Sequence, residues 1–204
     1  MLQGTNLACV RGDRKLFESI SFTLEAGGLM LVNGPNGSGK TSLLRILCGL
    51  SSPAMGKIIW NGIAIGSLGS EYYLDLTYIG HLSGTKDDLT ALENLRISSA
   101  LCGTKITDMQ ARDALENMGM GGREFLPAKI LSQGQRRRVA LARLLVCRTK
   151  LWVLDEPLAA LDVSAVKLIQ KLLEQHLKLG GMIVMTTHQK IDVTAASTVQ
   201  LQLA

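Results

Sequence analysis

The sequence predicts an α/β fold, with a mixed, largely parallel sheet and flanking helices, an antiparallel β edge and an inserted helical subdomain. Three observations support this prediction. The runs 151–154 and 182–187 are short and mostly apolar, as in strands buried on both faces of a parallel sheet. Residues 16–24 alternate between apolar and polar, which is typical of an antiparallel strand with one solvated face. From about residue 89 to 146 the apolar spacing becomes helical, which indicates the insertion.

Length and composition set the domain organisation. The chain has 204 residues and is 47% hydrophobic, enough to bury the core of one domain at 1–204. We expect an α/β core at 1–83 and 147–204, with a helical subdomain at 84–146. No apolar run approaches the roughly 20 residues that cross a bilayer, and residues 1–6 lack a basic region followed by an apolar one, so we expect a soluble protein. The four dispersed cysteines are typical of the reduced thiols of a cytoplasmic protein, and we expect them to bind no metal.

The first part of the chain is expected to be rich in strands. Gly27 and Gly28 turn the chain into a buried strand, and Pro53 interrupts the pattern after the first helix. Asn61 and Gly62 form the dipeptide that most strongly favours a hairpin turn. The predicted elements are strands at 6–10, 16–24, 29–32, 57–60 and 76–80 and a helix at 42–48.

The later helices have recognisable starts, because a Ser or Thr followed three residues later by Glu or Gln forms a capping box. Three such pairs occur, Thr90 with Glu93, Thr107 with Gln110 and Ser132 with Gln135. The second of these helices should stop near Gly119, and a further helix at 165–179 should end at Gly180 and Gly181. Strands are predicted at 151–154, 182–187 and 199–203.

Residues 34–41 match G-x-x-x-x-G-K-[ST] at every fixed position, between a predicted strand and a predicted helix. In such a loop the glycines let backbone N–H groups converge on phosphate oxygens, and the helix N-terminus adds partial positive charge. Lys40 would reach the β- and γ-phosphates, and Thr41 would place a hydroxyl on Mg²⁺. The alternative, a glycine-rich turn beside a surface lysine, does not account for the flanking elements. The predicted fold is therefore a P-loop NTPase core whose ATP-binding residues are Gly34, Pro35, Asn36, Gly37, Ser38, Gly39, Lys40, Thr41 and Ser42.

Three functional groups should meet at the carboxyl ends of the parallel strands, where ligands of open α/β sheets bind. They are the phosphate loop, the pair Asp155 and Glu156, and His188. Asp155 is predicted to hold Mg²⁺ directly or through water. Glu156 is predicted to polarise the water that attacks the γ-phosphate, and His188 is the third candidate catalytic residue beside Glu156 and Lys40.

In this order and spacing the motifs resemble those of the ATP-binding cassette (ABC) ATPases, over nearly the whole chain. Residues 151–156 resemble the Walker B strand of that family, 158–162 with Asp162 its D-loop, and His188 its switch histidine. The resemblance implies ATP hydrolysis with Mg²⁺ by a homodimer, in which the signature motif meets the nucleotide of the opposite subunit. The signature residues are Ser132, Gln133, Gly134 and Gln135.

Two positions depart from the general family pattern. Arg11 stands where an aromatic residue usually stacks on adenine, so it would either stack through its guanidinium or remain an exposed arginine. His81 stands where the family carries a glutamine near Mg²⁺. Because Mg²⁺ prefers oxygen to imidazole nitrogen, His81 is expected to act through a water or as a hydrogen-bond donor.

Residues 9–17, 78–95 and 131–143 resemble the ATP-binding subunits of the haem exporters of cytochrome c maturation. This narrower resemblance implies integral membrane partners of the CcmB and CcmC types, a peripheral place on the cytoplasmic face of a bacterial inner membrane, and ATP hydrolysis that drives haem export or release of a haem chaperone. No direct haem binding and no nucleic acid partner are expected. The alternatives are the ATPase subunit of another ABC transporter and a soluble ABC ATPase that acts on nucleic acid.

Three further surfaces were interpreted from the pattern alone. The run Arg136, Arg137 and Arg138 is interpreted as a solvated helix face, in preference to a contact with phosphate, lipid or nucleic acid. His176 is expected to be solvated as well. A few Met and Leu side chains at the edge of the helical subdomain are predicted to form a docking groove for a membrane subunit, while most of the others are core.

Overall fold

A five-stranded parallel sheet forms the centre of the computed structural model, which describes residues 1–189 and 191–204. The sheet has the strand order β6-β7-β8-β3-β9. Every residue of β7 and β8 is buried, as their apolar composition predicted. The strands are β3 (Gly28–Asn33), β6 (Leu76–Ile79), β7 (Leu151–Asp155), β8 (Met182–Thr186) and β9 (Ser197–Gln202).

The antiparallel strands form a separate four-stranded sheet of order β2-β1-β4-β5, packed beside the parallel one. The predicted hairpin is confirmed, since Trp60 pairs with Ile63 across Asn61 and Gly62. Both turn residues have positive φ, 49° and 87°, as a type I′ turn requires. The strands are β1 (Leu2–Arg11), β2 (Arg14–Leu24), β4 (Met55–Trp60) and β5 (Ile63–Ala64).

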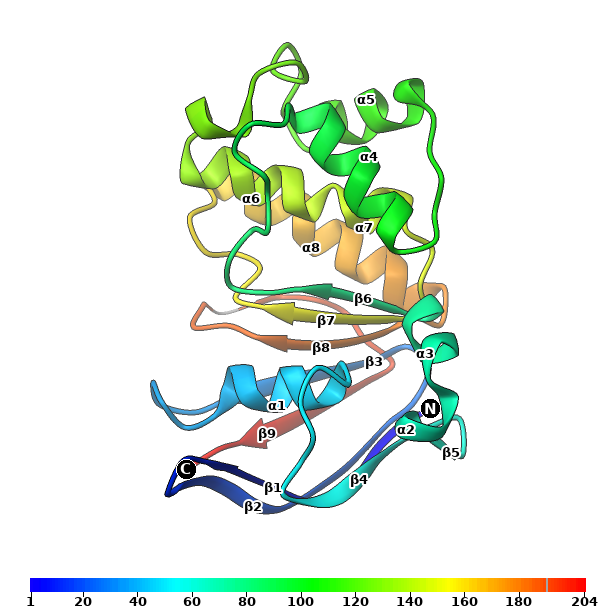
Figure 1. The fold of residues 1–204 in the computed structure, drawn as a ribbon, viewed down its shortest axis with the longest axis vertical. Helices are drawn as coiled ribbons and strands as arrows, with labels where there is room; N and C mark the ends of the chain where they lie inside the picture. The colour runs from blue at the N-terminus through cyan, green and yellow to red at the C-terminus, as the bar shows by residue number, and fades with distance from the viewer. Residues whose placement is uncertain (190) are drawn as a thin grey trace.

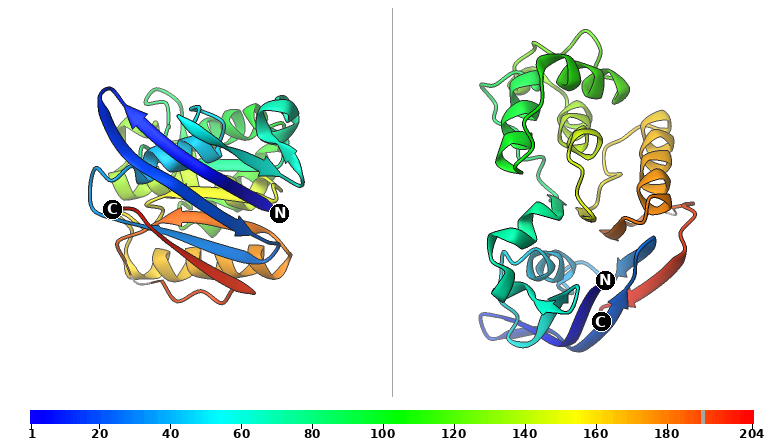
Figure 2. Two further views of the ribbon diagram at one scale, coloured as in Figure 1. Left: turned by 90° about the horizontal axis from the view of Figure 1, so that it is seen from below. Right: turned by 90° about the vertical axis from the view of Figure 1, so that its right-hand side faces the viewer.

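The helices cover the two faces of the parallel sheet differently (Figure 1). Helix α1 (Lys40–Leu47) lies between the two sheets, whereas α8 (Val163–Lys178) and a group of helices cover the other face. Figure 2 shows this group at one end of the molecule and both termini near the other. The group contains α4 (Ala91–Leu101), α5 (Asp108–Asn117), α6 (Gln133–Leu141) and α7 (Arg143–Val146), and the short elements elsewhere are α2 (Ile65–Leu68), α3 (Ser70–Leu74) and the 3₁₀ turn η1 (Ala128–Ile130).

Each face of the parallel sheet has its own hydrophobic core. One core joins α1 and the inner face of the antiparallel sheet, and the other joins α8 and the α4–α7 group. Among the helices of the described residues, none is both long enough and apolar enough to cross a membrane.

All three predicted capping boxes are confirmed. At α6, for example, the Gln135 N–H donates to Ser132 Oγ at 3.2 Å, and the Ser132 N–H donates to Gln135 Oε1 at 2.9 Å. Such a cap contributes about 1 kcal/mol to helix stability. Asp162 is the N-cap of α8, where its carboxylate accepts a hydrogen bond from the Ala165 N–H at 2.8 Å. This cap is not a capping box. Local sequence therefore determines where these helices begin.

The expectation that His176 is solvated is wrong. Its ring stacks on the indole of Trp152, with 3.7 Å between centroids and 7° between planes. Burial lowers the pKa of His176 below its usual value. The stack depends on Gly181, since a side chain at that position would collide with the imidazole. Helical periodicity placed His176 on a polar face of α8, but the neighbouring strand covers that face.

Candidate active site

The phosphate loop joins β3 to α1 in a conformation that only glycine adopts easily. Gly37 and Gly39 have φ of 83° and 99°. A Cβ on Gly39 would also come within 3.0 Å of Phe17 on β2. No side chain caps α1, so its first N–H groups remain available to an anion. Ser38 Oγ is buried and has no hydrogen-bond partner within the described residues. Its hydroxyl could therefore donate to a phosphate oxygen.

The Lys40 side chain folds back onto the start of the phosphate loop. Its Nζ donates to the carbonyl of Gly34 at 2.7 Å and to that of Pro35 at 3.2 Å. These bonds hold the ammonium group above the curled backbone. The sequence predicted that Lys40 reaches phosphates, and the structure places its ammonium group beside the carbonyls that begin the phosphate loop.

Asp155 lies at the centre of a hydrogen-bonded group at the carboxyl ends of β7 and β8. Thr41 Oγ1 donates to Asp155 Oδ2 at 2.7 Å, which links the phosphate loop to β7. Thr186, the neighbour of Asp155 on β8, donates to Oδ1 at 2.7 Å and accepts from the Glu156 N–H at 2.9 Å. Asp155 is 2% exposed. The adjacent carboxylate and hydroxyl oxygens suit Mg²⁺, which prefers oxygen ligands.

Glu156 has a backbone conformation that is costly for any residue with a side chain. Its φ is 50°, in the left-handed region, and such strain persists only where surrounding contacts enforce it. His188 Nε2 lies 3.4 Å from Glu156 Oε1, and that oxygen has no hydrogen-bond donor in the described chain. The structure thus brings together Lys40, Thr41, Asp155, Glu156 and His188, while the His188 side chain remains 63% exposed.

Arg137 belongs to this site, although the run of three arginines predicted a solvated helix face. Its guanidinium donates to the carbonyls of Asp155 at 2.7 Å, Glu156 at 2.8 Å and Gly80 at 2.6 Å. The residue is 3% exposed, and burial lowers its pKa while the Asp155 carboxylate opposes that shift. One signal was available, because Arg137 lies four residues before the buried Leu141 and therefore on the inner face of α6.

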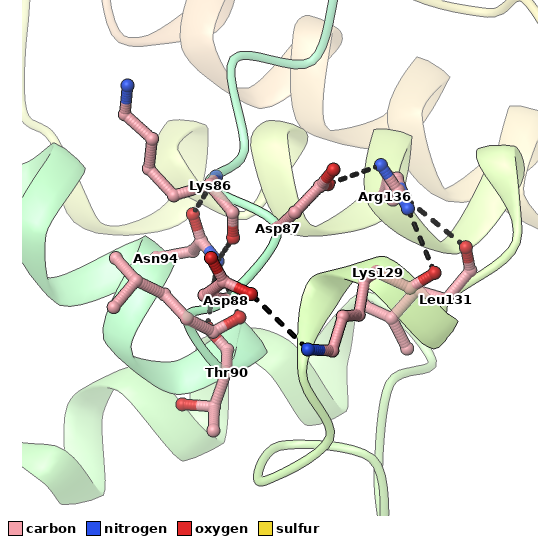
Figure 3. A network of polar contacts seen from close by, with 9 residues as sticks. Lys86, Asp87, Asp88, Thr90, Asn94, Lys129, Leu131 and Arg136 are labelled. Carbon is pink, nitrogen blue, oxygen red and sulfur yellow. Dashed lines mark hydrogen bonds and ion pairs between the residues drawn. The ribbon is translucent and has the colours of Figure 1, made fainter.

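The other two arginines are partly exposed and form ion pairs with exposed carboxylates, so the solvated-face interpretation is wrong for Arg137 alone. Arg136 forms an ion pair with Asp87 at 2.7 Å and donates to the Lys129 carbonyl at 3.0 Å (Figure 3). Lys129 in turn lies 3.3 Å from Asp88. Arg138 donates to Asp162 at 2.6 Å. Each arginine therefore connects the signature helix to a different loop.

The signature residues line a hollow of about 360 Å³ with the D-loop. Ser132, Gly134, Gln135 and Asp162 contribute to it. Hydrogen bonds from the Ser164 hydroxyl and the Ala165 N–H, with the charge of Arg138, lower the pKa of Asp162 to about 2. Helices α6 and α1 lie on opposite faces of the parallel sheet (Figure 1), so the structure does not bring the signature to the phosphate loop of the same chain.

Arg11 and His81 lie outside the hydrogen-bonded group. Arg11 ends β1 in an exposed hairpin, where it pairs with Arg14 across the strands. His81 is exposed after β6, and its backbone carbonyl lies 3.5 Å from Arg137 Nη1. Among the described residues neither side chain makes a hydrogen bond, so their predicted contacts with adenine and Mg²⁺ stay predictions.

The chain belongs to the ABC transporter family, whose model matches residues 17–159. Within that family it belongs with the proteins named cytochrome c biogenesis ATP-binding export protein CcmA. The CcmA protein of Nitrosospira multiformis is 67% identical over 99% of this chain and 98% of its own length. That of Nitrosomonas europaea is 60% identical over 100% of this chain and 96% of its own length.

Solved structures show the same fold. A putative ABC transporter ATP-binding protein from Pyrococcus furiosus has a TM-score of 0.83 at 27% identity, and covers 99% of this chain and 96% of its own. An ATP-binding cassette described as a dimeric post-hydrolysis state with ADP and Pi has a TM-score of 0.81 at 23% identity, over 93% of this chain and 88% of its own. The fold and the family assignment therefore agree.

We expect Thr186→Val to impair the site without changing its shape. The substitution removes the hydroxyl that donates to Asp155 and accepts from the Glu156 N–H. ATP hydrolysis should therefore fall roughly 10- to 100-fold. Steady-state phosphate release measures the effect. Thr77→Val is the matched control, because among the described residues the buried Thr77 hydroxyl bonds only Thr149. This variant should lower stability but not the activity of the folded protein. Equal activity losses in both variants would contradict the assigned role of Thr186.

Proposed function

We propose that this chain is the nucleotide-binding subunit of an ABC exporter in cytochrome c biogenesis and that it hydrolyses MgATP as a homodimer. The observation that supports the catalytic part most directly is the chain of contacts from Thr41 through Asp155 and Thr186 to Glu156, which joins the phosphate loop to the candidate base. The proposed transport role follows from the CcmA relatives.

Each residue that the structure brings together at this site has a proposed task. The loop N–H groups and Lys40 bind the β- and γ-phosphates, and Thr41 with Asp155 would hold Mg²⁺, which neutralises phosphate charge when bound. Glu156 would orient and polarise the attacking water, because its Oε1 is buried and accepts no hydrogen bond within the described chain. His188, whose Nε2 lies 3.4 Å from Glu156 Oε1, would contact the γ-phosphate beside the same water.

The homodimer explains why two phosphate-binding elements face different directions. Ser132 begins a helix whose N-terminus attracts anions, yet α6 and α1, the helix that follows the phosphate loop, lie on opposite faces of one sheet. A head-to-tail pair of chains would close each loop with the signature of the partner. Asp162, held by Arg138 beside that signature, would line the seam.

Mixing two inactive variants should restore activity if the sites are composite. Lys40→Ala disables the phosphate loop and Ser132→Arg blocks the signature, so their mixed dimer retains one intact site. An equimolar mixture should therefore recover roughly a quarter of wild-type ATPase activity when one site suffices. Phosphate release before and after mixing measures this recovery.

The control mixture combines Lys40→Ala with Glu156→Gln. Both residues lie on the loop side of the same site, so their mixed dimer has no intact site and should stay inactive. Rescue in this control, or its absence in the first mixture, would contradict the head-to-tail dimer.

Exposed apolar side chains support a membrane partner. Ile97 and Leu101 lie four residues apart on one face of α4 and are 46% and 84% exposed, and Met109 on α5 is 70% exposed. As expected, most other apolar residues of these helices are core. We propose that this edge docks CcmB-like and CcmC-like subunits at the cytoplasmic face of the bacterial inner membrane. Haem export or release of a haem chaperone would then be driven without haem contacting this chain.

Affinity purification of the tagged chain from native membranes tests the transport role. Mass spectrometry should identify CcmB-like and CcmC-like proteins, and the eluate should hydrolyse ATP. Leu101→Glu should lose these partners, whereas Met55→Glu, at a 61% exposed position of the antiparallel sheet, should keep them. Recovery of a different permease would preserve the catalytic assignments and overturn the cargo.

A further inference from the structure

One arginine of the helical subdomain, Arg123, has no partner for its side chain within the described chain. Residues 84–146 contain seven arginines. Six of them contact a carboxylate, a carbonyl or an aromatic ring, and these are Arg96, Arg112, Arg136, Arg137, Arg138 and Arg143. The Arg123 guanidinium makes no such contact with residues 1–189 and 191–204, and the residue is exposed. Its charge is therefore available to a group outside this chain.

Arg123 lines the hollow of about 360 Å³ that the signature residues form with the D-loop. The charged side chains of that hollow are Arg123, Arg138 and Asp162. Arg138 and Asp162 form an ion pair at 2.6 Å, so their charges largely cancel. The guanidinium of Arg123 is left as the unopposed charge, and the N-terminus of α6 at Ser132 adds partial positive charge. The hollow therefore favours an anion.

The backbone on both sides of Arg123 is fixed, although the side chain is exposed. The Arg123 N–H donates to the Met120 carbonyl at 3.0 Å, and the Arg123 carbonyl accepts from the Leu126 N–H at 3.1 Å. The Glu124 carbonyl accepts from the N–H of Leu92 on α4 at 2.9 Å. These bonds anchor the turn that carries Arg123 to α4, so the guanidinium extends from a defined place beside the signature.

The phosphate loop of the same chain does not supply the anion, because α6 and α1 lie on opposite faces of the parallel sheet (Figure 1). The proposed head-to-tail dimer does supply one, since it brings the nucleotide of the partner to the signature residues. The phosphates of that nucleotide are anionic and rich in oxygen acceptors. A guanidinium presents its N–H groups in a planar fork that matches phosphate oxygens.

We propose that the Arg123 guanidinium binds the phosphate groups of the nucleotide that the partner chain holds in its phosphate loop. This inference rests on the proposed function, because it needs the head-to-tail dimer, and it adds a residue that acts across the seam. Arg123 increases the affinity of the dimer for MgATP. It takes no part in the activation of water, which belongs to Glu156.

The first test measures, by light scattering, how much MgATP the Glu156→Gln protein needs in order to dimerise. Adding Arg123→Gln should raise the midpoint about tenfold, because each composite site loses a cation from its nucleotide. Arg123→Lys keeps the charge but not the fork, so it should raise the midpoint less. An unchanged midpoint with Arg123→Gln would overturn this inference alone. A Glu156→Gln protein that stays monomeric in MgATP would instead overturn the proposed dimer.

Arg112→Gln is the matched control for this titration. It removes the same charge from the same subdomain, but the Arg112 guanidinium lies 4.9 Å from the centroid of the Phe125 ring and does not line the hollow. The midpoint should therefore stay within about twofold of its starting value. Equal shifts with Arg112→Gln and Arg123→Gln would show that net charge alone matters, and would overturn the inference.

The second test asks whether Arg123 acts across the seam. In the otherwise unchanged protein, Arg123→Gln should raise the KM for MgATP about tenfold and leave kcat within about twofold, as expected of lost nucleotide binding. In mixed dimers with Lys40→Ala, the working phosphate loop faces the intact Arg123 of the other chain. The mixture should therefore gain a component with the original KM.

The control mixture combines Arg123→Gln with a chain that carries both Lys40→Ala and Arg123→Gln. Its working loops face only substituted chains, so the component with the original KM should be absent. Its presence there, or its absence from the first mixture, would overturn the inference. The mixture of Lys40→Ala with Ser132→Arg tests the dimer without changing Arg123, so recovery there together with failure here would reject the role of Arg123 and keep the proposed function.

Discussion

Glu156→Gln is expected to bind ATP, to hydrolyse it about 10²- to 10⁴-fold more slowly, and to accumulate as a nucleotide-dependent dimer. The amide has nearly the same shape as the carboxylate but cannot polarise the attacking water. The Thr186 bond to the Glu156 backbone does not involve the side chain, so the loop and Asp155 should keep their arrangement. Phosphate release and light scattering with and without MgATP measure the two effects.

Lys40→Ala is the matched control, because it removes the phosphate contact and leaves Glu156 in place. It should lose turnover without accumulating the dimer. A Glu156→Gln variant that stays monomeric in MgATP would contradict the sandwich in which ATP joins two chains. Near-normal turnover would remove Glu156 from its proposed role.

Arg137→Met should cost about 3 kcal/mol or more of unfolding free energy, which is at the high end for a single substitution. Three carbonyls, those of Gly80, Asp155 and Glu156, would lose a charged donor that is now 2.8 Å away or closer. The apolar methionine fills much of the space but offers no hydrogen bond. Urea unfolding followed by circular dichroism measures the loss.

Arg136→Met tests whether burial causes this effect. Arg136 has 29% of its side chain exposed and faces Asp87, which is 61% exposed, so its loss should cost about 1 kcal/mol or less. Equal destabilisation by both variants would show that the buried carbonyl contacts of Arg137 contribute no more to the unfolding free energy than the exposed ion pair of Arg136. ATPase activity of the remaining folded Arg137→Met protein should also fall, because the strained turn at Glu156 loses its anchor.

Local features were predicted well because they depend on residues close in the chain. The capping boxes at Thr90, Thr107 and Ser132 and the hairpin at Asn61 need only a few neighbouring residues in the right order. Buried parallel strands were also recognisable, since β7 and β8 are mostly apolar. Even the convergence of Asp155 with the loop followed from the rule that ligands gather at the carboxyl ends of parallel strands.

The errors concern polar side chains whose surroundings come from distant segments. Arg137 and His176 both read as solvated because charge and helical position describe only their own helix. Their partners, the carbonyls after β7 and the indole of Trp152, lie on other elements. Thr186 was missed for the same reason, since a threonine in a buried strand shows its role only when β7 and β8 align.

The sequence by itself determined the class of fold, the phosphate loop, the helix starts and the family motifs, because these depend on short-range geometry and on residue types at fixed spacing. Only the tertiary structure decided which polar groups are buried and what they bind. It placed Arg137 on the end of β7, Thr186 between Asp155 and Glu156, and Arg143 against Cys102. The physical reason is that the free energy of a buried polar group depends on the partners that folding brings to it, and those partners are distant in the chain.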